Sequence, residues 1–344
     1  MGNRGRLIAP GGLRDEPAAG ASDEPAAGGP LAALAARHGL RPSSERPGLV
    51  SYLRKVWQRR HFIVAYATAR NVSMYTEARL GQLWQVLTPL LNSAVYYLIF
   101  GVLFKANRGI SNYTAYLVTG VFIFAFTERS IVVGSSAVRA NITLIRALYF
   151  PRACLPLAYV LVEFQQLLLS MVVLFAIVLG TGEPLTWYWL LLMPTLLLQA
   201  TFNVGAALIM ARVGAAAQDI SQLVPFLLRV WRYFCGVMYS IASLPATLPE
   251  WAKNVLSLNP AAVYISLTRY AIMETYRADA PGARPYNAAR CAIFTVTKTP
   301  SMQAYCHPDI MTSQLWLAAA GWAIVTAAAG VLCFWQAETR YGRG

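Results

Sequence analysis

The chain has 344 residues, of which 57% are hydrophobic and only 13% carry a charge. Soluble domains carry about 25% charged residues, so this composition excludes a soluble enzyme. Lys and Arg total 29 against 15 Asp and Glu, but no basic run is interleaved with aromatic residues away from the regions that flank apolar stretches. Nucleic-acid binding is therefore disfavoured, and the sequence predicts an all-α integral membrane protein.

The first 82 residues divide into two regions of different composition. Residues 1–47 are rich in Ala, Gly and Pro and repeat the sequence Asp-Glu-Pro-Ala-Ala-Gly, which is typical of a disordered tail. Residues 48–82 place apolar side chains such as Val56 and Trp57 at helical spacing between basic ones. We expect this region to be an amphipathic helix on the cytoplasmic membrane interface. A helix packed on a cytosolic partner is the alternative.

Six apolar segments follow, each close to the roughly 20 residues that a membrane-crossing helix needs. We expect membrane passes near 83–104, 116–137, 155–179, 187–210, 222–243 and 313–335. One long loop, 244–312, is expected on the same side of the membrane as the short connections 105–115 and 180–186. The connections 138–154 and 211–221 are expected on the opposite side, together with both termini.

The placement of the basic residues predicts the orientation of these passes. On the side that holds the termini there are 18 Lys and Arg, whereas the other side holds 8, most of them in the long loop 244–312. Positive charge in short loops favours the cytoplasmic side, and long loops escape this rule. We therefore expect both termini in the cytoplasm and residues 244–312 on the outer face.

Motifs for nucleotide or metal binding are absent from the sequence. It contains no G-x-x-x-x-G-K-[ST], C-x-x-C or H-E-x-x-H motif, and its three His residues are far apart. We therefore expect this chain to hold no catalytic residue, metal or cofactor. Cys291 and Cys306 both fall in the expected outer loop, where an oxidising environment permits a disulfide bond between them.

Several ionisable residues fall inside the expected passes, where charge is costly and usually marks a pair or a functional site. They are Glu128, Arg129, Glu163, Arg229 and Arg232. One interpretation is a set of ion pairs inside the bundle, foremost between Glu163 and an arginine. The other is that the arginines bind an anionic group of a transported substrate, because a guanidinium matches phosphate geometry. Aromatic side chains in the same passes either pack against their neighbours or line a path.

Motifs shared with one transporter family occur here in the same order along the chain. Around the first two passes they are Arg70, Tyr75, Gly81, Trp84 and Gly120, with Asn71 where the family usually has Asp and Phe124 where it has Trp. Further along they are Asn141, Phe150-Pro151-Arg152, Arg212, Asp219-Ile220, Leu258-Asn259-Pro260 and Arg269. Over residues 48–275 and the last pass, the chain resembles an ABC-2 type permease. The similarity is greatest to the branch that exports lipid-linked polysaccharides and teichoic acids.

The resemblance implies export of a polyprenyl-diphosphate-linked polysaccharide or teichoic acid across a bacterial plasma membrane. It also implies a homodimer, outer re-entrant helices, and a separate ABC ATPase subunit that holds ATP and Mg²⁺. On this basis, we expect the substrate path to include Arg70, Arg79, Tyr96, Phe124, Glu128, Arg129, Glu163, Arg229 and Arg232. Coupling to the ATPase is expected at Arg59, Arg60, Asn141, Arg146, Phe150, Pro151 and Arg152.

Other functions are weighed against this one. An ABC-2 exporter of drugs or small lipids would lack the basic N-terminal helix and the Phe-Pro-Arg segment, both of which are present. A membrane glycosyltransferase would need acidic residues on an outer loop, but nothing in the spacing of Glu250, Glu274, Asp279 and Asp309 marks them as catalytic. A structural membrane subunit without transport leaves the intramembrane charges unexplained.

Overall fold

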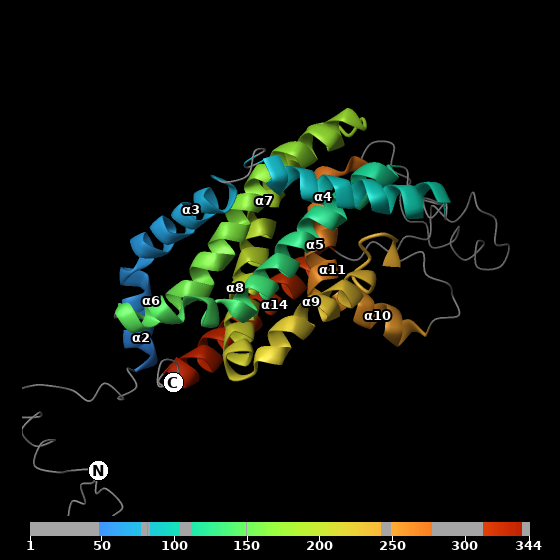
Figure 1. The fold of residues 1–344 in the computed structure, drawn as a ribbon. Coiled ribbons are helices and arrows are strands. Elements are labelled where there is room, and N and C mark those ends of the chain that lie inside the picture. Colours follow the sequence, from blue (N-terminus) through green and yellow to red (C-terminus); the bar gives the residue numbers. More distant parts are fainter. Residues whose placement is uncertain are drawn as a thin grey trace, which may run out of the picture. The chain divides into compact units, whose positions relative to one another are not determined.

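The structure is a computed structural model that describes residues 48–76, 81, 83–103, 112–148, 150–241, 249–276 and 312–338. In these ranges the regular secondary structure is helical throughout, without any strand. Figure 1 shows the long helices side by side, with shorter helices near their ends. The predicted all-α class is therefore confirmed for the described part of the chain. The expected tail at 1–47 lies outside it.

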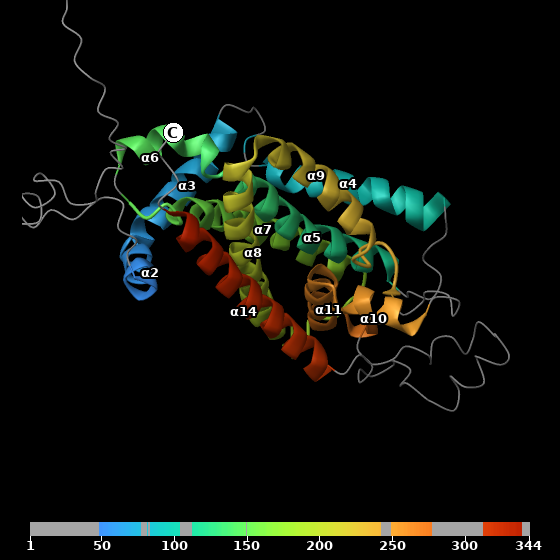
Figure 2. The ribbon, with the colours of Figure 1, turned by 90° about the horizontal axis from the view of Figure 1, so that it is seen from below.

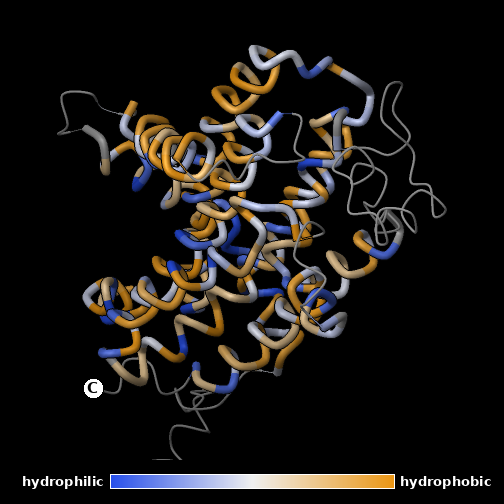
Figure 3. Tube along the Cα trace, turned by 90° about the vertical axis from the view of Figure 1, so that its right-hand side faces the viewer, coloured by the Kyte–Doolittle hydropathy of each residue, from blue (hydrophilic) through white to orange (hydrophobic). Residues whose placement is uncertain are grey.

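Five helical segments in the described ranges are long and apolar enough to cross a membrane. They are α4 (Leu83–Tyr96) with η1 (Tyr97–Leu103), α5 (Tyr113–Ser136), α7 (Cys154–Gly180), η3 (Trp187–Leu191) with α8 (Leu192–Ala216), and α14 (Thr312–Ala337). Their composition is strongly apolar, as the interior of a bilayer requires, and Figure 3 shows how hydrophobic residues are distributed along the trace. Five of the six predicted passes therefore correspond to helices of sufficient length.

The predicted fifth pass, over 222–243, is not a helix of that length. Helix α9 (Gln218–Tyr233) has 16 residues, fewer than a bilayer requires, and a turn follows it. Gly236 in this turn has a φ of 62°, which glycine adopts without strain. The predicted connection 211–221 is also wrong, because α8 continues to Ala216 and only Ala217 separates it from α9.

Helix α9 and its turn nevertheless follow α5 over its whole length. At one end, Ser221 donates a hydrogen bond to the carbonyl oxygen of Ser135 at 3.3 Å. At the other, the Tyr113 hydroxyl donates to the carbonyl oxygen of Met238 at 3.0 Å. The 24 residues of α5 span about 36 Å. Residues 218–238 therefore extend as far as a membrane-crossing helix, although only part of them is helical.

One end of the bundle collects the short helices α2 (Leu49–Gln58), α6 (Ile142–Ala147) and η2 (Arg139–Asn141), and α3 (Arg60–Thr76) starts there. We call it the α2 end. The single interface helix predicted over 48–82 is two helices, because the chain breaks at Arg59 between α2 and α3. Buried apolar residues of α2, α3, α7 and the end of α14 form one core here: Tyr52, Val56, Ile63, Ala67, Cys154, Leu155, Phe334 and Ala337.

Helix α10 (Glu250–Leu258) leads into α11 (Pro260–Ile272), which lies beside α14 and continues to η5 (Glu274–Tyr276). Trp322 donates to the carbonyl oxygen of Leu258 at 2.8 Å, which puts the bend between α10 and α11 about 15 Å along α14 from its start. The backbone nitrogen of Glu274 donates to the Glu183 carboxylate at 2.7 Å, just beyond α7. Helix α11 therefore runs from inside the bundle to the end opposite α2.

Helices α8 and α14 cross closely, as Figure 2 shows. A Cβ on Gly205 would lie 2.3 Å from backbone atoms of Thr326, and one on Gly330 would lie 2.4 Å from the Gly205 carbonyl oxygen. Backbone atoms cannot move aside as the end of a flexible side chain can, so both positions require glycine.

We expect Gly205→Val to lower the midpoint of thermal unfolding in detergent by about 3–10 °C, because overpacking costs about 1–3 kcal/mol. The matched control is Gly321→Val in α14, where a Cβ meets no atom within 4 Å. Size-exclusion chromatography after heating measures both variants. Equal stability of the two variants would contradict the close crossing.

Candidate transport path and coupling surface

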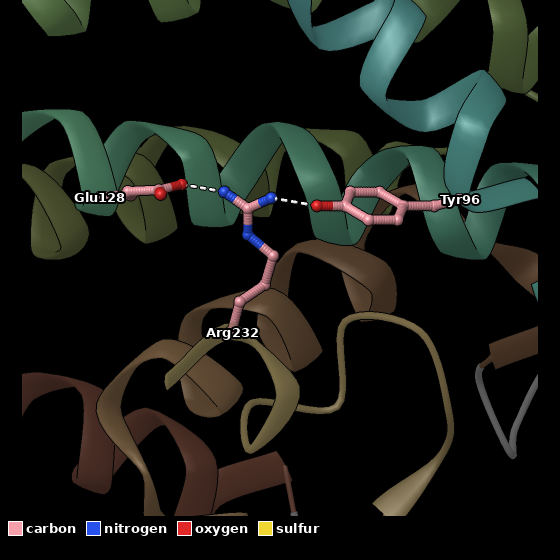
Figure 4. A network of polar contacts seen from close by, with 3 residues as sticks. All are labelled: Tyr96, Glu128 and Arg232. Atoms are coloured by element: carbon pink, nitrogen blue, oxygen red, sulfur yellow. Dashed lines mark hydrogen bonds and ion pairs between the residues drawn. The ribbon is translucent and has the colours of Figure 1, made fainter. Parts of the chain in front are cut away.

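An ion pair between α9 and α5 lies at the centre of the expected path. The Arg232 guanidinium donates to the Glu128 carboxylate and also to the Tyr96 hydroxyl on α4 (Figure 4). The two charged side chains are 14% and 17% exposed. In surroundings of low dielectric constant such a pair is strong, and its loss is costly. The network therefore connects three helices that are distant in sequence.

Aromatic rings surround this ion pair. The Arg232 guanidinium carbon lies 5.3 Å from the ring centroid of Phe124 and 5.7 Å from that of Tyr96, within the range of a cation–π interaction. Phe124 is buried and meets Trp231 edge-on at 5.7 Å. The structure thus brings together four of the predicted path residues. Phe124 packs under the guanidinium and is not open to a path.

The two arginines of α9 differ in their surroundings. Arg229 is exposed, whereas the ion pair and the hydrogen bond of Arg232 join Arg232 to Glu128 and Tyr96. Residues three apart on a helix point in directions that differ by about 60° around its axis. Because of this difference, Arg232 points into the bundle and Arg229 lies at the surface. Of the two, Arg229 is the one that an approaching anion can reach.

The predicted pairing of Glu163 with an arginine is wrong, since the ion pair among the described residues is Glu128–Arg232. Arg129 instead donates to the side-chain oxygen of Gln166 at 3.4 Å. Glu163 is buried, and its Oε2 has no hydrogen-bond partner in the structure. Arg129 and Glu163 line one small cavity of about 20 Å³ with Phe126 and Ser170. The two side chains therefore lie across one cavity from each other, without an ion pair between them.

Arg269 is a residue of the site that the sequence analysis names only as part of a family motif. It is 2% exposed and donates to the carbonyl oxygens of Gly236 at 3.0 Å, Val237 at 2.9 Å and Tyr116 at 2.9 Å. Its guanidinium also lies 3.3 Å from the ring centroid of Tyr116. Arg269 therefore satisfies backbone carbonyls where α9 has ended.

Gly120 on α5 makes room for that guanidinium. A Cβ at this position would lie 2.6 Å from Nη2 of Arg269, closer than any non-bonded contact of that type. Gly120 and Arg269 belong to separate motifs in the sequence, and the fold brings them into contact. Because the two residues are distant in sequence, their contact could not be predicted from their spacing.

The expected coupling segment is joined to α3 and α7 through Asn141. The Tyr66 hydroxyl donates to Oδ1 of Asn141 at 2.7 Å, and Nδ2 of Asn141 donates to the Tyr159 hydroxyl at 2.9 Å. Arg70 lies over the ring of Tyr159 at 4.3 Å, so its guanidinium packs at this junction. Burial raises the pKa of Tyr66 above its ordinary value, which keeps its hydroxyl available as a donor.

The remaining predicted coupling residues lie around this junction at the α2 end. Phe150 packs on Phe62 of α3 with ring centroids 5.3 Å apart. Arg59 and Arg60 are exposed at the break between α2 and α3, and Arg146 is exposed on α6. Pro151 is half-buried before the start of α7. The predicted path residue Arg79 and the predicted disulfide Cys291–Cys306 lie outside the described residues.

Comparison with known proteins places these features in a family. The family model described as "ABC-2 type transporter" matches residues 63–273, from α3 to the end of α11. The chain belongs to the ABC-2 type transporter family. The match includes the Glu128–Arg232 pair, the Arg269 cluster and the Asn141 junction, whereas α2 and α14 lie beyond it.

Individual relatives of this ABC-2 transporter chain carry a more specific name. The O-antigen export system permease protein RfbA of Myxococcus xanthus is 26% identical over 241 residues, which are 70% of this chain and 90% of that protein. The protein of the same name from Klebsiella pneumoniae is 28% identical over 194 residues, which are 56% of this chain and 72% of that protein.

We expect Glu128→Gln and Arg232→Gln each to destabilise this ABC-2 transporter chain by about 3 kcal/mol, because either change leaves a charge without its partner. Exchanging the two residues, Glu128→Arg with Arg232→Glu, should restore part of the loss. Thermal unfolding in detergent measures this. Arg229→Gln, on the same helix, should shift stability by less than about 0.5 kcal/mol. Equal stability of Arg229→Gln and Arg232→Gln would refute the pair.

Proposed function

We propose that this chain is the permease subunit of an ABC exporter that moves a lipid-linked polysaccharide from the inner to the outer face of the plasma membrane. The observation that carries this proposal is the similarity to O-antigen export permeases, which extends over 90% of the length of one of them. The matched stretch comprises 70% of this chain. It favours a polysaccharide over a drug, a small lipid or a teichoic acid as the cargo.

A separate ABC ATPase supplies the energy in this proposal. The chain has no phosphate-binding G-x-x-x-x-G-K-[ST] motif, so ATP and Mg²⁺ bind to the partner. The α2 end faces the cytoplasm, because it holds the exposed basic residues Arg59, Arg60 and Arg146. The ATPase contacts these residues and the segment that ends in Pro151 and Arg152. Its closure on ATP moves the short helices against the bundle.

Two copies of the chain form the path between them. Large apolar side chains are exposed on α4 and α9, among them Leu91, Val95, Phe226 and Val230. Such a surface fits either lipid or a second copy related by two-fold symmetry. With α9 at the path, the exposed Arg229 meets the diphosphate group, while Arg232 holds α4, α5 and α9 in place. Helices α10 and α11 form the re-entrant pair at the outer face.

The test is depletion of the protein in its own cell, followed by labelling of the lipid-linked polymer with a probe that cannot cross the membrane. We expect surface polymer to fall by about tenfold or more, and lipid-linked polymer to accumulate where only permeabilised cells are labelled. We expect so large a fall in surface polymer because polar polymers do not cross a bilayer without a transporter. Re-expression of the wild-type chain should restore the surface signal.

Two outcomes of this experiment count against the proposal. Normal surface polymer after depletion would exclude export of that polymer by this chain. If a teichoic acid is lost while the surface polysaccharide stays intact, the chain is still an exporter, but its substrate is a teichoic acid.

A further inference from the structure

A cluster at the α2 end joins three segments that are far apart in sequence. The Tyr52 hydroxyl of α2 donates to Oε2 of Glu338 at 2.8 Å, across 286 residues of chain. The backbone nitrogen of Arg152 donates to Oε1 of the same carboxylate at 3.0 Å. The Arg152 guanidinium also donates to the Glu338 carbonyl oxygen. One acidic residue after α14 therefore holds both α2 and the start of α7.

This cluster is built into the core of the α2 end. Tyr52 is 3% exposed, and its oxygen also accepts a hydrogen bond from the backbone nitrogen of Ala153 at 3.4 Å. Phe334 and Ala337 of α14 are buried in the same core. Burial raises the pKa values of both Tyr52 and Glu338. The half-buried Glu338 carboxylate accepts from two donors, so loss of either donor leaves an acceptor unsatisfied.

Helix α14 continues from this cluster to the opposite part of the bundle. It crosses α8 at Gly205 and Gly330 without room for a side chain. Further along, the carbonyl oxygen of Ala319 accepts a hydrogen bond from the Tyr264 hydroxyl of α11 at 2.9 Å. Polar contacts therefore hold α14 near both of its ends, at Ala319 and at Glu338. Glu338, the residue after α14, contacts Arg152, and α14 itself contacts α11 through Ala319.

We propose that Tyr52, Arg152 and Glu338 form a clasp through which α14 carries movement of the coupling surface to α10 and α11. The inference rests on the proposed function, because the movement of the coupling surface is the one that the ATPase causes when it closes on ATP. Glu338 and Tyr52 are positioning residues in this account, and neither touches substrate. Both lie outside the 63–273 region that defines the family match.

The test uses Tyr52→Phe, Glu338→Gln and the double variant, in the complex with the ATPase partner reconstituted in membrane vesicles. Tyr52→Phe keeps the ring and loses one donor, whereas Glu338→Gln keeps the shape and loses one of its two acceptors. We expect ATP hydrolysis within twofold of wild type and export reduced about fivefold or more, the size of a typical coupling between sites. The double variant should be no worse than either single variant, because both remove the same contact.

Matched controls change the same chemical groups elsewhere. Tyr188→Phe alters a partly exposed tyrosine of η3, and Glu274→Gln alters an acid at the opposite end of the bundle. Both should export at the wild-type rate.

Each contrary result has a defined meaning. Normal export by Tyr52→Phe and Glu338→Gln would overturn the clasp, and so would a parallel loss of ATP hydrolysis and export, since that indicates a merely structural role. A wild-type complex that hydrolyses ATP but moves no polysaccharide would overturn the proposed function, and the clasp with it.

Discussion

The bilayer offers no water to backbone groups, so a chain that crosses it must satisfy every carbonyl and amide internally. This constraint bears hardest on residues 218–238, where the helix ends at Tyr233 while the chain continues beside α5. Arg269 meets the constraint by donating to carbonyl oxygens of Gly236, Val237 and Tyr116. The interrupted crossing, the glycine at position 120 and the position of α11 all depend on this one buried guanidinium.

Two further arginines also donate to acceptors on segments that are distant in sequence. Arg232 is paired with Glu128 inside the bundle, and Arg152 binds the end of α14 beside Tyr52. Each connects segments that would otherwise meet only through apolar contacts, which are weakly directional. A transporter needs helices that move as defined units, and polar contacts of this kind specify which helices move together.

Hydropathy predicted most of the fold because length and apolar content are local properties. Five predicted segments match helices of membrane-spanning length, with bounds that differ by at most six residues. The predicted candidates Tyr96, Phe124, Glu128 and Arg232 lie in one network. The pairing itself was not predictable, since Glu128 and Arg232 are 104 residues apart and Glu163 offers an equally plausible carboxylate in sequence. The turn after α9 was not predictable either, because it is held by Arg269, which is distant in sequence.

The measurement that tests this account most directly is hydrogen–deuterium exchange of residues 231–241 in lipid nanodiscs, for wild type and Arg269→Gln. The amides of Phe234 and Cys235 donate to the carbonyl oxygens of Trp231 and Arg232 in the turn that Arg269 holds. The account predicts slow exchange in wild type and exchange faster by about tenfold or more in the variant, since an unsatisfied buried group costs about 1–3 kcal/mol. Peptides from α7 should be unchanged. Equal exchange in the two proteins would show that the turn is held by something other than Arg269.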